Sequence, residues 1–302
     1  MQTNLPGTTP PTPEGLSMQT PASLAARLFL ALLLPALAGA AGAQGTPPAF
    51  VVGVLPNVSA RVIATTYQPM QAYLQRELGR PVEVATAPDF RAFSGNTMKG
   101  LYQMVVTAPN LGRVNELDGR WEPVAIYEPA IPALLVTAAG NPDASPAQLR
   151  GKVLAVGNPQ SLVVLRGLQW LREQGLQEGR DFRITRAGNE DSLAPLIRSG
   201  EAPFAMMSMG EFRSISEPVR KGLRIATEFA RVPGFLVMLN PALSGEERVR
   251  VRSVVLRFPA SDEGRAFFAQ TGFADIRALK PGELAPLDAF AAITRAALRP
   301  PE

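Results

Sequence analysis

Apolar and polar positions follow two alternating periods along most of the chain. From residue 49 onward, short apolar runs of the kind found in buried strands are followed by stretches in which apolar residues recur every three or four positions, as on one face of a helix. Residues 49–56 illustrate the first pattern. Residues 65–79, with Tyr67, Met70 and Leu74 at helical spacing before Gly79, illustrate the second. This alternation predicts an α/β protein with mostly parallel strands.

The pattern divides the chain into two α/β lobes. Strands are predicted at 49–56, 82–87, 101–107, 121–128, 131–140, 152–158, 181–188, 203–208, 223–230 and 234–240, and helices at 65–79, 88–100, 108–117, 159–174, 189–199, 244–256, 261–271 and 283–298. Strands near 132–138 and 234–240 are candidate crossings between the lobes, with lobe 1 at 44–137 plus 237–302 and lobe 2 at 138–236. Two lobes joined by two crossing strands make a hinge, and a hinge predicts a ligand cleft.

The first 43 residues have the pattern of an export signal. Arg27 precedes an apolar run over 28–37, and Ala41-Gly42-Ala43 fits the small-residue cleavage site of a signal peptide. The run is well short of the roughly 20 residues that span a bilayer, although an N-terminal membrane anchor is the alternative. We expect translation to start at Met18 and cleavage near Ala43, leaving a soluble periplasmic protein.

Composition narrows the chemistry. The chain has no histidine and no cysteine, which excludes cysteine nucleophiles, Ser-His-Asp triads, disulfides and a lipid-modified cysteine, and leaves no cofactor expected. The net charge of +4 is spread without a run of five basic residues. We therefore expect no nucleic-acid partner, whereas a positive surface modestly favours a small anionic ligand. We expect a monomer.

Several short motifs resemble one family in their order and spacing. They are Gly53-Val54-Leu55-Pro56, Tyr67-Gln68-Pro69-Met70, the stretch 78–82 (LGRPV), Ala87-Pro88-Asp89-Phe90, Thr107-Ala108-Pro109-Asn110 and the stretch 149–159 (LRGKVLAVGNP). Over most of the chain they resemble the phosphonate, phosphite and phosphate periplasmic binding proteins of ABC transporters. The resemblance implies a type II periplasmic-binding-protein fold, with the ligand's oxyanion between the lobes and an ABC permease as the membrane partner. Helix starts, where free N–H groups meet the positive end of the helix dipole, would face that oxyanion.

Candidate ligand residues in lobe 1 follow two of its strands. Asn57 and Ser59 come after the first strand, and Thr107 and Asn110 come after the third. Ligands of open α/β sheets bind at this edge, although ordinary helix caps and turns have the same residues. Tyr67 and Phe90 could form the cleft wall. Because Tyr67 lies on an apolar helix stripe, core packing is the favoured role for it.

Candidate residues in lobe 2 depart from the family pattern. Asn158, Gln160 and Ser161 stand at the start of the helix over 159–174, where the resemblance implies a run of hydroxyl residues. Leu162 and Val163 follow instead. Pro203 and Ser208 stand where the resemblance implies aspartates, so Ser208 is the candidate at the end of its strand. These departures make a changed ligand plausible.

The stretch Glu201–Phe212 contains three methionines beside Ser208. Thioethers are soft ligands that suit Cu(I). Met206 and Met207, however, point to opposite faces of a strand, so both cannot join one site. We therefore predict core packing, with the strand opening onto the cleft at Ser208, Met209 and Gly210.

These observations favour a non-catalytic solute-binding protein of an ABC importer. A ligand-sensing periplasmic module for a membrane receptor kinase needs the same cleft and is an alternative. An enzyme on the same fold is a third hypothesis, for which the acids Glu128, Glu190 and Asp191 form no motif with a partner.

Overall fold

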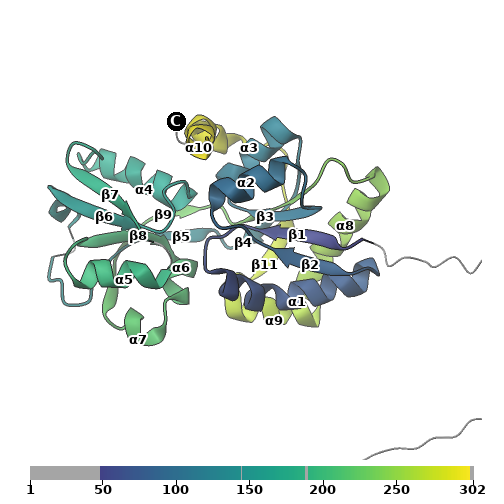
Figure 1. Ribbon diagram of the computed structural model, residues 1–302, viewed down its shortest axis with the longest axis horizontal. Coiled ribbons are helices and arrows are strands. Elements are labelled where there is room, and N and C mark those ends of the chain that lie inside the picture. Colours follow the sequence, from purple (N-terminus) through teal and green to yellow (C-terminus); the bar gives the residue numbers. More distant parts are fainter. Residues whose placement is uncertain (1–47, 144, 188–189, 300–302) are drawn as a thin grey trace, which may run out of the picture. The chain divides into compact units, whose positions relative to one another are not determined.

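Two β-sheets, each flanked by helices, make up the described part of the chain (Figure 1). The structure is a computed structural model that describes residues 48–143, 145–187 and 190–299. The predicted signal peptide and Met18 lie outside these residues. The predicted α/β composition is confirmed, and none of the described helices is long and apolar enough to cross a membrane.

The first sheet has six strands, in the order β11-β4-β10-β3-β1-β2. Their bounds are β1 Phe50–Val54, β2 Val82–Ala85, β3 Met104–Thr107, β4 Glu122–Glu128, β10 Leu236–Leu239 and β11 Asp275–Ala278. β1 runs parallel to β2 and β3. β10 lies antiparallel to both β3 and β4, and β11 lies antiparallel to β4.

The second sheet has five strands, in the order β7-β6-β8-β5-β9. Their bounds are β5 Ile131–Ala138, β6 Lys152–Val156, β7 Phe182–Arg186, β8 Phe204–Ser208 and β9 Leu223–Val232. β6 is parallel to β7 and β8, and β5 is antiparallel to β8 and β9. The predicted lobe limits stay a prediction. The strand pairing places β5 in this second sheet.

Helices cover both faces of each sheet. Their bounds are α1 Ala60–Leu78, α2 Phe90–Met98, α3 Pro109–Gly119, α4 Leu162–Glu173, α5 Glu190–Arg198, α6 Met209–Ser214, α7 Glu217–Arg220, α8 Gly245–Arg257, α9 Asp262–Thr271 and α10 Asp288–Leu298. Short 3-10 turns occupy Pro146–Leu149, Phe258–Ala260 and Ala285–Leu287. On the first sheet, α1, α8 and α9 share one apolar cluster, and α2 and α3 share another on the other face. On the second sheet α4 and α5 lie on opposite faces (Figure 1).

The expectation of mostly parallel strands is wrong. Among the described strand pairs four are parallel and five antiparallel. The expectation assumed that a helix joins each strand to the next, as parallel pairing requires. Instead β4 passes directly to β5 and β9 passes directly to β10, and each passage leaves one sheet for the other.

Short or weakly patterned elements also differ from prediction. α1 begins at Ala60, five residues before the predicted start at 65, because Ile63 is the sole buried residue in its first five positions and the apolar stripe is faint there. It ends as predicted at Gly79, which takes the left-handed conformation at φ 66°. α6, α7 and β11 were not predicted, since elements of four to six residues are too short to show a period.

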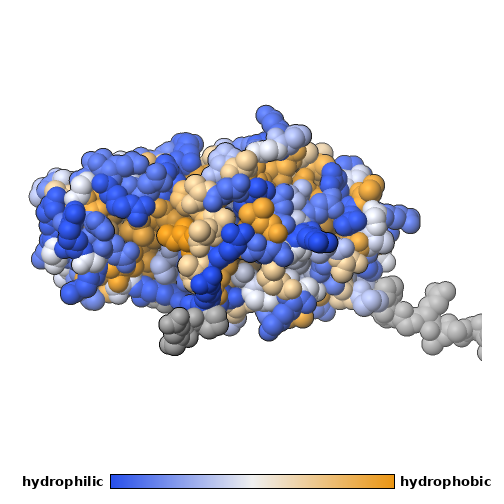
Figure 2. All heavy atoms as spheres, turned by 90° about the horizontal axis from the view of Figure 1, so that it is seen from above, coloured by the Kyte–Doolittle hydropathy of each residue, from blue (hydrophilic) through white to orange (hydrophobic). Residues whose placement is uncertain are grey.

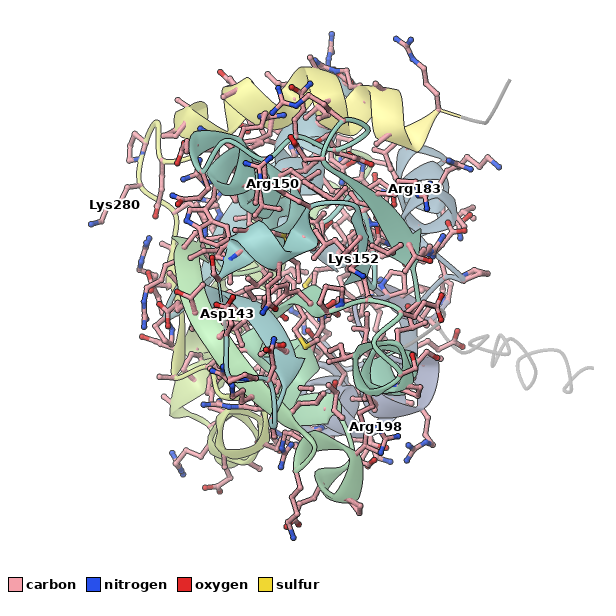
Figure 3. The ribbon with its side chains drawn as sticks, turned by 90° about the vertical axis from the view of Figure 1, so that its left-hand side faces the viewer. Asp143, Arg150, Lys152, Arg183, Arg198 and Lys280 are labelled. Atoms are coloured by element: carbon pink, nitrogen blue, oxygen red, sulfur yellow. The ribbon has the colours of Figure 1, made fainter. Side chains whose placement is uncertain are left out.

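Charged side chains are dispersed over the far end of the second sheet. Arg150, Lys152, Arg183 and Arg198 project there at separate points, with Asp143 among them (Figure 3). Arg150 is paired with Asp181 at 2.8 Å. The positive charge of the chain is therefore spread on this face.

The passage from β9 to β10 includes a close backbone approach. A Cβ atom at Gly234 would overlap the carbonyl oxygen of Tyr127. Tyr127 lies near the end of β4, next to the passage from β4 to β5. Glycine is thus required where the two crossing segments meet.

We expect Gly234→Ala to lower the free energy of unfolding by about 1–3 kcal/mol, because the backbone of Tyr127 must move to admit the methyl group. Gly140→Ala, in an exposed turn with no atom near the added carbon, is the matched control and should change stability little. Urea unfolding measures both. Equal midpoints for the two variants would contradict the close approach.

Two ion pairs fasten α10 to α3. Arg113 Nε lies 2.6 Å from Asp288 Oδ1, and Arg295 Nη2 lies 2.7 Å from Asp118 Oδ1. The arginine partners hold the pKa of Asp118 and of Asp288 below the ordinary value. Since both folded-state pKa values are depressed, these pairs stabilise the protein above the unfolded pKa of about 4, and that contribution is lost as the pH falls through the folded values.

The double variant Asp118→Asn, Asp288→Asn should therefore be less stable than the wild type at pH 6 and lose less stability on acidification below about pH 4. Urea midpoints across pH 3 to 7 measure this. Parallel pH curves for the variant and the wild type would show that the two pairs do not contribute.

Candidate ligand-binding site

A pocket of about 330 Å³ lies between segments of both sheets. It is lined by Asn57 and Val58 after β1, residues 62–63 and 66–67 on α1, the β4–β5 passage at 129–132, residues 208–210, 213 and 214 at β8 and α6, Arg231, Phe235, and residues 267 and 270–273 at the end of α9. The end of β8 and the start of α1 thus meet across it. Its volume is at the small end of the range of ligand pockets, which is about 300–1,000 Å³.

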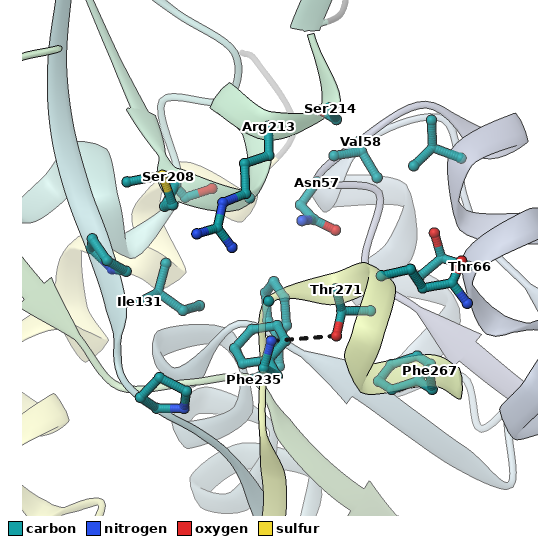
Figure 4. A pocket seen from close by; sticks show the side chains of 18 of the residues that line it. Asn57, Val58, Thr66, Ile131, Ser208, Arg213, Ser214, Phe235, Phe267 and Thr271 are labelled. Atoms are coloured by element: carbon teal, nitrogen blue, oxygen red, sulfur yellow. Dashed lines mark hydrogen bonds between the residues drawn. The ribbon is translucent and has the colours of Figure 1, made fainter. Parts of the chain in front are cut away.

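Arg213 supplies a positive charge at this pocket. Figure 4 shows its side chain extending from α6 into the space between Ser208 and Asn57, with Thr271 across from it. Among the described residues no carboxylate lies within ion-pair distance of its guanidinium, whereas the second arginine of the lining, Arg231, pairs with Glu228 at 2.7 Å. The pocket therefore has a cation available to an anion.

Aromatic rings form the apolar wall. Tyr127 makes edge contacts with Phe235, Phe267 and Phe273, and Tyr67 makes an edge contact with Phe267 at 5.3 Å between ring centroids. Burial raises the pKa of the Tyr67 and Tyr127 phenols well above the ordinary value, so both remain neutral. The wall adds surface and shape but no charge.

Three of the predicted ligand residues, Asn57, Tyr67 and Ser208, line this pocket. Ser208 is also the N-cap of α6: its hydroxyl accepts from the Glu211 N–H at 3.1 Å, and the Glu211 carboxylate accepts from the Ser208 N–H at 2.6 Å. Ser59 is the N-cap residue of α1 and lies outside the lining. Met209 and Gly210 line the pocket beside Ser208, which is where the strand was expected to open onto the cleft.

The remaining predicted residues lie elsewhere, most of them near α3, α4 and α10. Asn110 is fully buried, and its amide donates at 3.1 Å both to the Gln160 carbonyl and to the Thr294 hydroxyl of α10. The Gln160 amide donates to the Ala297 carbonyl at 3.4 Å. These bonds tie the starts of α3 and α4, from the two sheets, to α10.

The other four have different surroundings: two make turn or cap hydrogen bonds, and two are buried. Asn158 accepts from the Gln160 N–H, and Ser161 caps α4 by accepting from the Val164 N–H. Phe90 begins α2 and is buried in the apolar cluster of that face. Thr107 is buried, and its hydroxyl has no partner among the described residues. A ligand role for these residues stays a prediction.

Leu162 and Val163 are buried where the family resemblance implied hydroxyl groups. They begin α4 yet belong to a cluster that includes Leu55, Phe90 and Leu111 from the first sheet's side, together with Leu284. This apolar cluster therefore spans both sheets. The start of α4 is occupied by packing and does not line the pocket beside Arg213.

The methionines considered as metal ligands and the acids considered for catalysis lie as follows. Met206 and Met207 belong to the clusters on opposite faces of the second sheet, as predicted. Glu128 pairs with Arg277 at 2.7 Å, and the side chains of Glu190 and Asp191 lie outside the described residues. In the described ranges no group of three or more acidic side chains is placed to hold a metal ion.

Sequence reasoning missed Arg213 and the α9 segment. Arg213 lies three residues after Gly210, so a helix starting at Met209 places both on one face, and that spacing could have revealed it. Nothing in the sequence brings Thr271 or Phe273 to the same pocket, because α9 reaches it through packing against α1.

Comparison with known proteins identifies the family. Residues 52–284 match the family model described as ABC transporter, phosphonate, periplasmic substrate-binding protein. No curated protein matches the chain.

Solved structures with low sequence identity share the fold. The binding protein component of a phosphonate ABC transporter from Pseudomonas aeruginosa aligns with a TM-score of 0.72 at 16% identity, over 83% of this chain and 89% of that one. PhnD1 from Prochlorococcus marinus in complex with methylphosphonate gives 0.69 at 12%, over 82% and 98%. A Xanthomonas citri protein bound to ATP gives 0.67 at 21%, over 83% and 99%. The expected type II periplasmic-binding-protein fold is confirmed.

A substitution of Asn110 tests whether the buried polar residues beside α10 stabilise the fold. Asn110→Ala should lower the free energy of unfolding by about 1–3 kcal/mol, because the buried Thr294 hydroxyl and the Gln160 carbonyl lose a donor. Thr107→Val removes a buried hydroxyl that has no partner within the described ranges, so it should leave stability unchanged or slightly higher. Urea unfolding measures both. Loss of ligand binding without loss of stability in Asn110→Ala would instead support its predicted ligand role.

Proposed function

The chain belongs to the family of periplasmic substrate-binding proteins of phosphonate ABC transporters, and on that basis we propose that it binds a small anion beside Arg213 and delivers it to a membrane permease. Members of this family are substrate-binding proteins, and the permease is the partner that such proteins serve. The proposal assigns the ligand to the pocket between β8–α6 and β1–α1.

The observation that carries the proposal is the guanidinium of Arg213, which lies at a pocket and has no carboxylate partner among the described residues. A guanidinium presents a planar fork of donors that matches a phosphonate or a carboxylate with two parallel hydrogen bonds. The amide of Asn57 and the hydroxyl of Ser208 lie on either side of it and can donate to the remaining oxygens (Figure 4). An oxyanion of tetrahedral shape would thus meet donors from both sheets.

Solved relatives support the ligand class. One is in complex with methylphosphonate and another is bound to ATP, and both ligands carry phosphorus oxyanions. The net positive charge of the chain would steer such anions toward the protein.

Ligand sensing for a membrane receptor kinase would use the same pocket and differs only in the partner. Family membership favours transport, because the matched family is one of importer components. Stimulated uptake by a reconstituted permease, rather than ligand affinity, separates the two roles.

Arg213→Gln should weaken binding of methylphosphonate by about 10- to 150-fold, because hydrogen bonds to charged groups contribute about 1.5–3 kcal/mol each. The matched control is Arg183→Gln, which removes the same charge from an exposed position at the end of the second sheet. Isothermal titration calorimetry of the chain from Gln44 onward measures both. Similar affinities for the two variants would exclude this pocket as the anion site.

A further inference from the structure

The pocket has two unlike sides. In Figure 4 the polar side chains Arg213, Ser208 and Asn57 lie along one side, and Ile131, Phe235 and Phe267 lie along the opposite side. The Thr271 hydroxyl also lies on that opposite side, where it accepts a hydrogen bond from the Phe273 N–H. An anion held by Arg213 would therefore direct any substituent toward apolar carbon. The side that carries Arg213 provides the affinity for charge. The side that carries the rings contacts the substituent and can select it.

The volume exceeds what an inorganic oxyanion fills. At about 30 Å³ per water molecule, 330 Å³ corresponds to about ten waters. With inorganic phosphate bound, water would remain against the partly exposed rings of Phe235 and Phe273, whereas Phe267 is buried. An apolar group that displaces this water gains the free energy of removing apolar surface from solvent.

The lining also lacks a counter-charge for a cationic substituent. None of its residues in the described part of the chain is Asp or Glu. Its charged residues are both arginines: Arg213 repels an ammonium group, whereas the charge of Arg231 is paired with Glu228. The phenol of Tyr67 is neutral. The carboxylate of Glu211 on α6 is bonded to the Ser208 N–H and is not part of the lining. Burying an ammonium group here would remove it from water without a partner.

We infer that this pocket selects organophosphonates whose substituent is an uncharged apolar alkyl or aryl group, over inorganic phosphate and over aminoalkylphosphonates. The inference rests on the proposed function, because it assumes that Arg213 holds the anion. It goes further in naming the part of the ligand that the apolar wall recognises.

Propylphosphonate and 2-aminoethylphosphonate form a matched pair, since they have equal length and differ in a terminal methyl against an ammonium group. Each buried methylene tightens binding about four-fold, so propylphosphonate should bind about fifteen-fold more tightly than methylphosphonate. It should also bind at least tenfold more tightly than 2-aminoethylphosphonate. Inorganic phosphate should bind more weakly than methylphosphonate. Calorimetric titration of the unmodified chain with these four compounds measures the order.

A variant separates the wall from the anion site. Val62 is half-buried on α1 and lines the pocket. Val62→Thr keeps its shape and replaces a methyl group with a hydroxyl, so the affinity for propylphosphonate should fall by a larger factor than the affinity for methylphosphonate. Both affinities falling by the same factor would point to a general disturbance of the site and would count against the assigned wall.

The outcomes distinguish the proposed function from the inference about the substituent. If none of the four compounds binds, the proposed function fails, and the inference fails with it. If methylphosphonate binds in an Arg213-dependent way but 2-aminoethylphosphonate equals or exceeds propylphosphonate, the inference alone is overturned. The expected order, with the changed ratio in Val62→Thr, supports both.

Discussion

The apolar contact between the two sheets is the constraint on which the rest of the structure depends. Leu162 and Val163, at the start of α4, are buried in the same cluster as Leu55 and Leu111 from the first sheet's side. Burial of these side chains excludes water from the region around them, so polar groups there need partners within the protein. The bonds of the Asn110 amide to Gln160 and Thr294 meet that requirement in part, since Asn110 Oδ1 and the Thr107 hydroxyl have no partner among the described residues. The start of α4 is thus packed, whereas the pocket lies beside Arg213 and the end of α9.

The same constraint explains how family membership and a changed site coexist. The fold needs two sheets and two direct passages between them, and many apolar sequences satisfy that need. A ligand site needs particular groups at particular points, and a few substitutions relocate them. Here the implied hydroxyl run is replaced by packing side chains, and a position implied to be acidic is the cap Ser208, five residues before Arg213. The fold is thus retained although these positions differ from the pattern that the resemblance implies.

The surface around α10 lies beside the contact between the two sheets. Viewed from above in Figure 2, apolar surface lies near the middle of the molecule and is flanked by hydrophilic side chains. Met98, Leu101, Leu117 and Ile293 are large apolar residues that remain exposed in the helical region of α2, α3 and α10. The ion pairs of Arg113 and Arg295 hold α10 against α3, and Thr294 on its buried side completes the bonds of Asn110. The last helix therefore closes one side of the contact between the sheets.

The sequence by itself determined the α/β class and nearly all the longer elements, because hydrophobic period and glycine stops act over a few neighbouring residues. The family resemblance added the expectation that Ser208, Met209 and Gly210 open onto a cleft. The sequence also determined that Met206 and Met207 face opposite ways, since strand geometry is local. The tertiary structure alone decided that β10 and β5 pair antiparallel, that Asn110 faces Gln160 and Thr294 rather than the pocket, and that α9 brings Thr271 and Phe273 to Arg213. Those outcomes depend on contacts between segments far apart along the chain, for which no local pattern carries information.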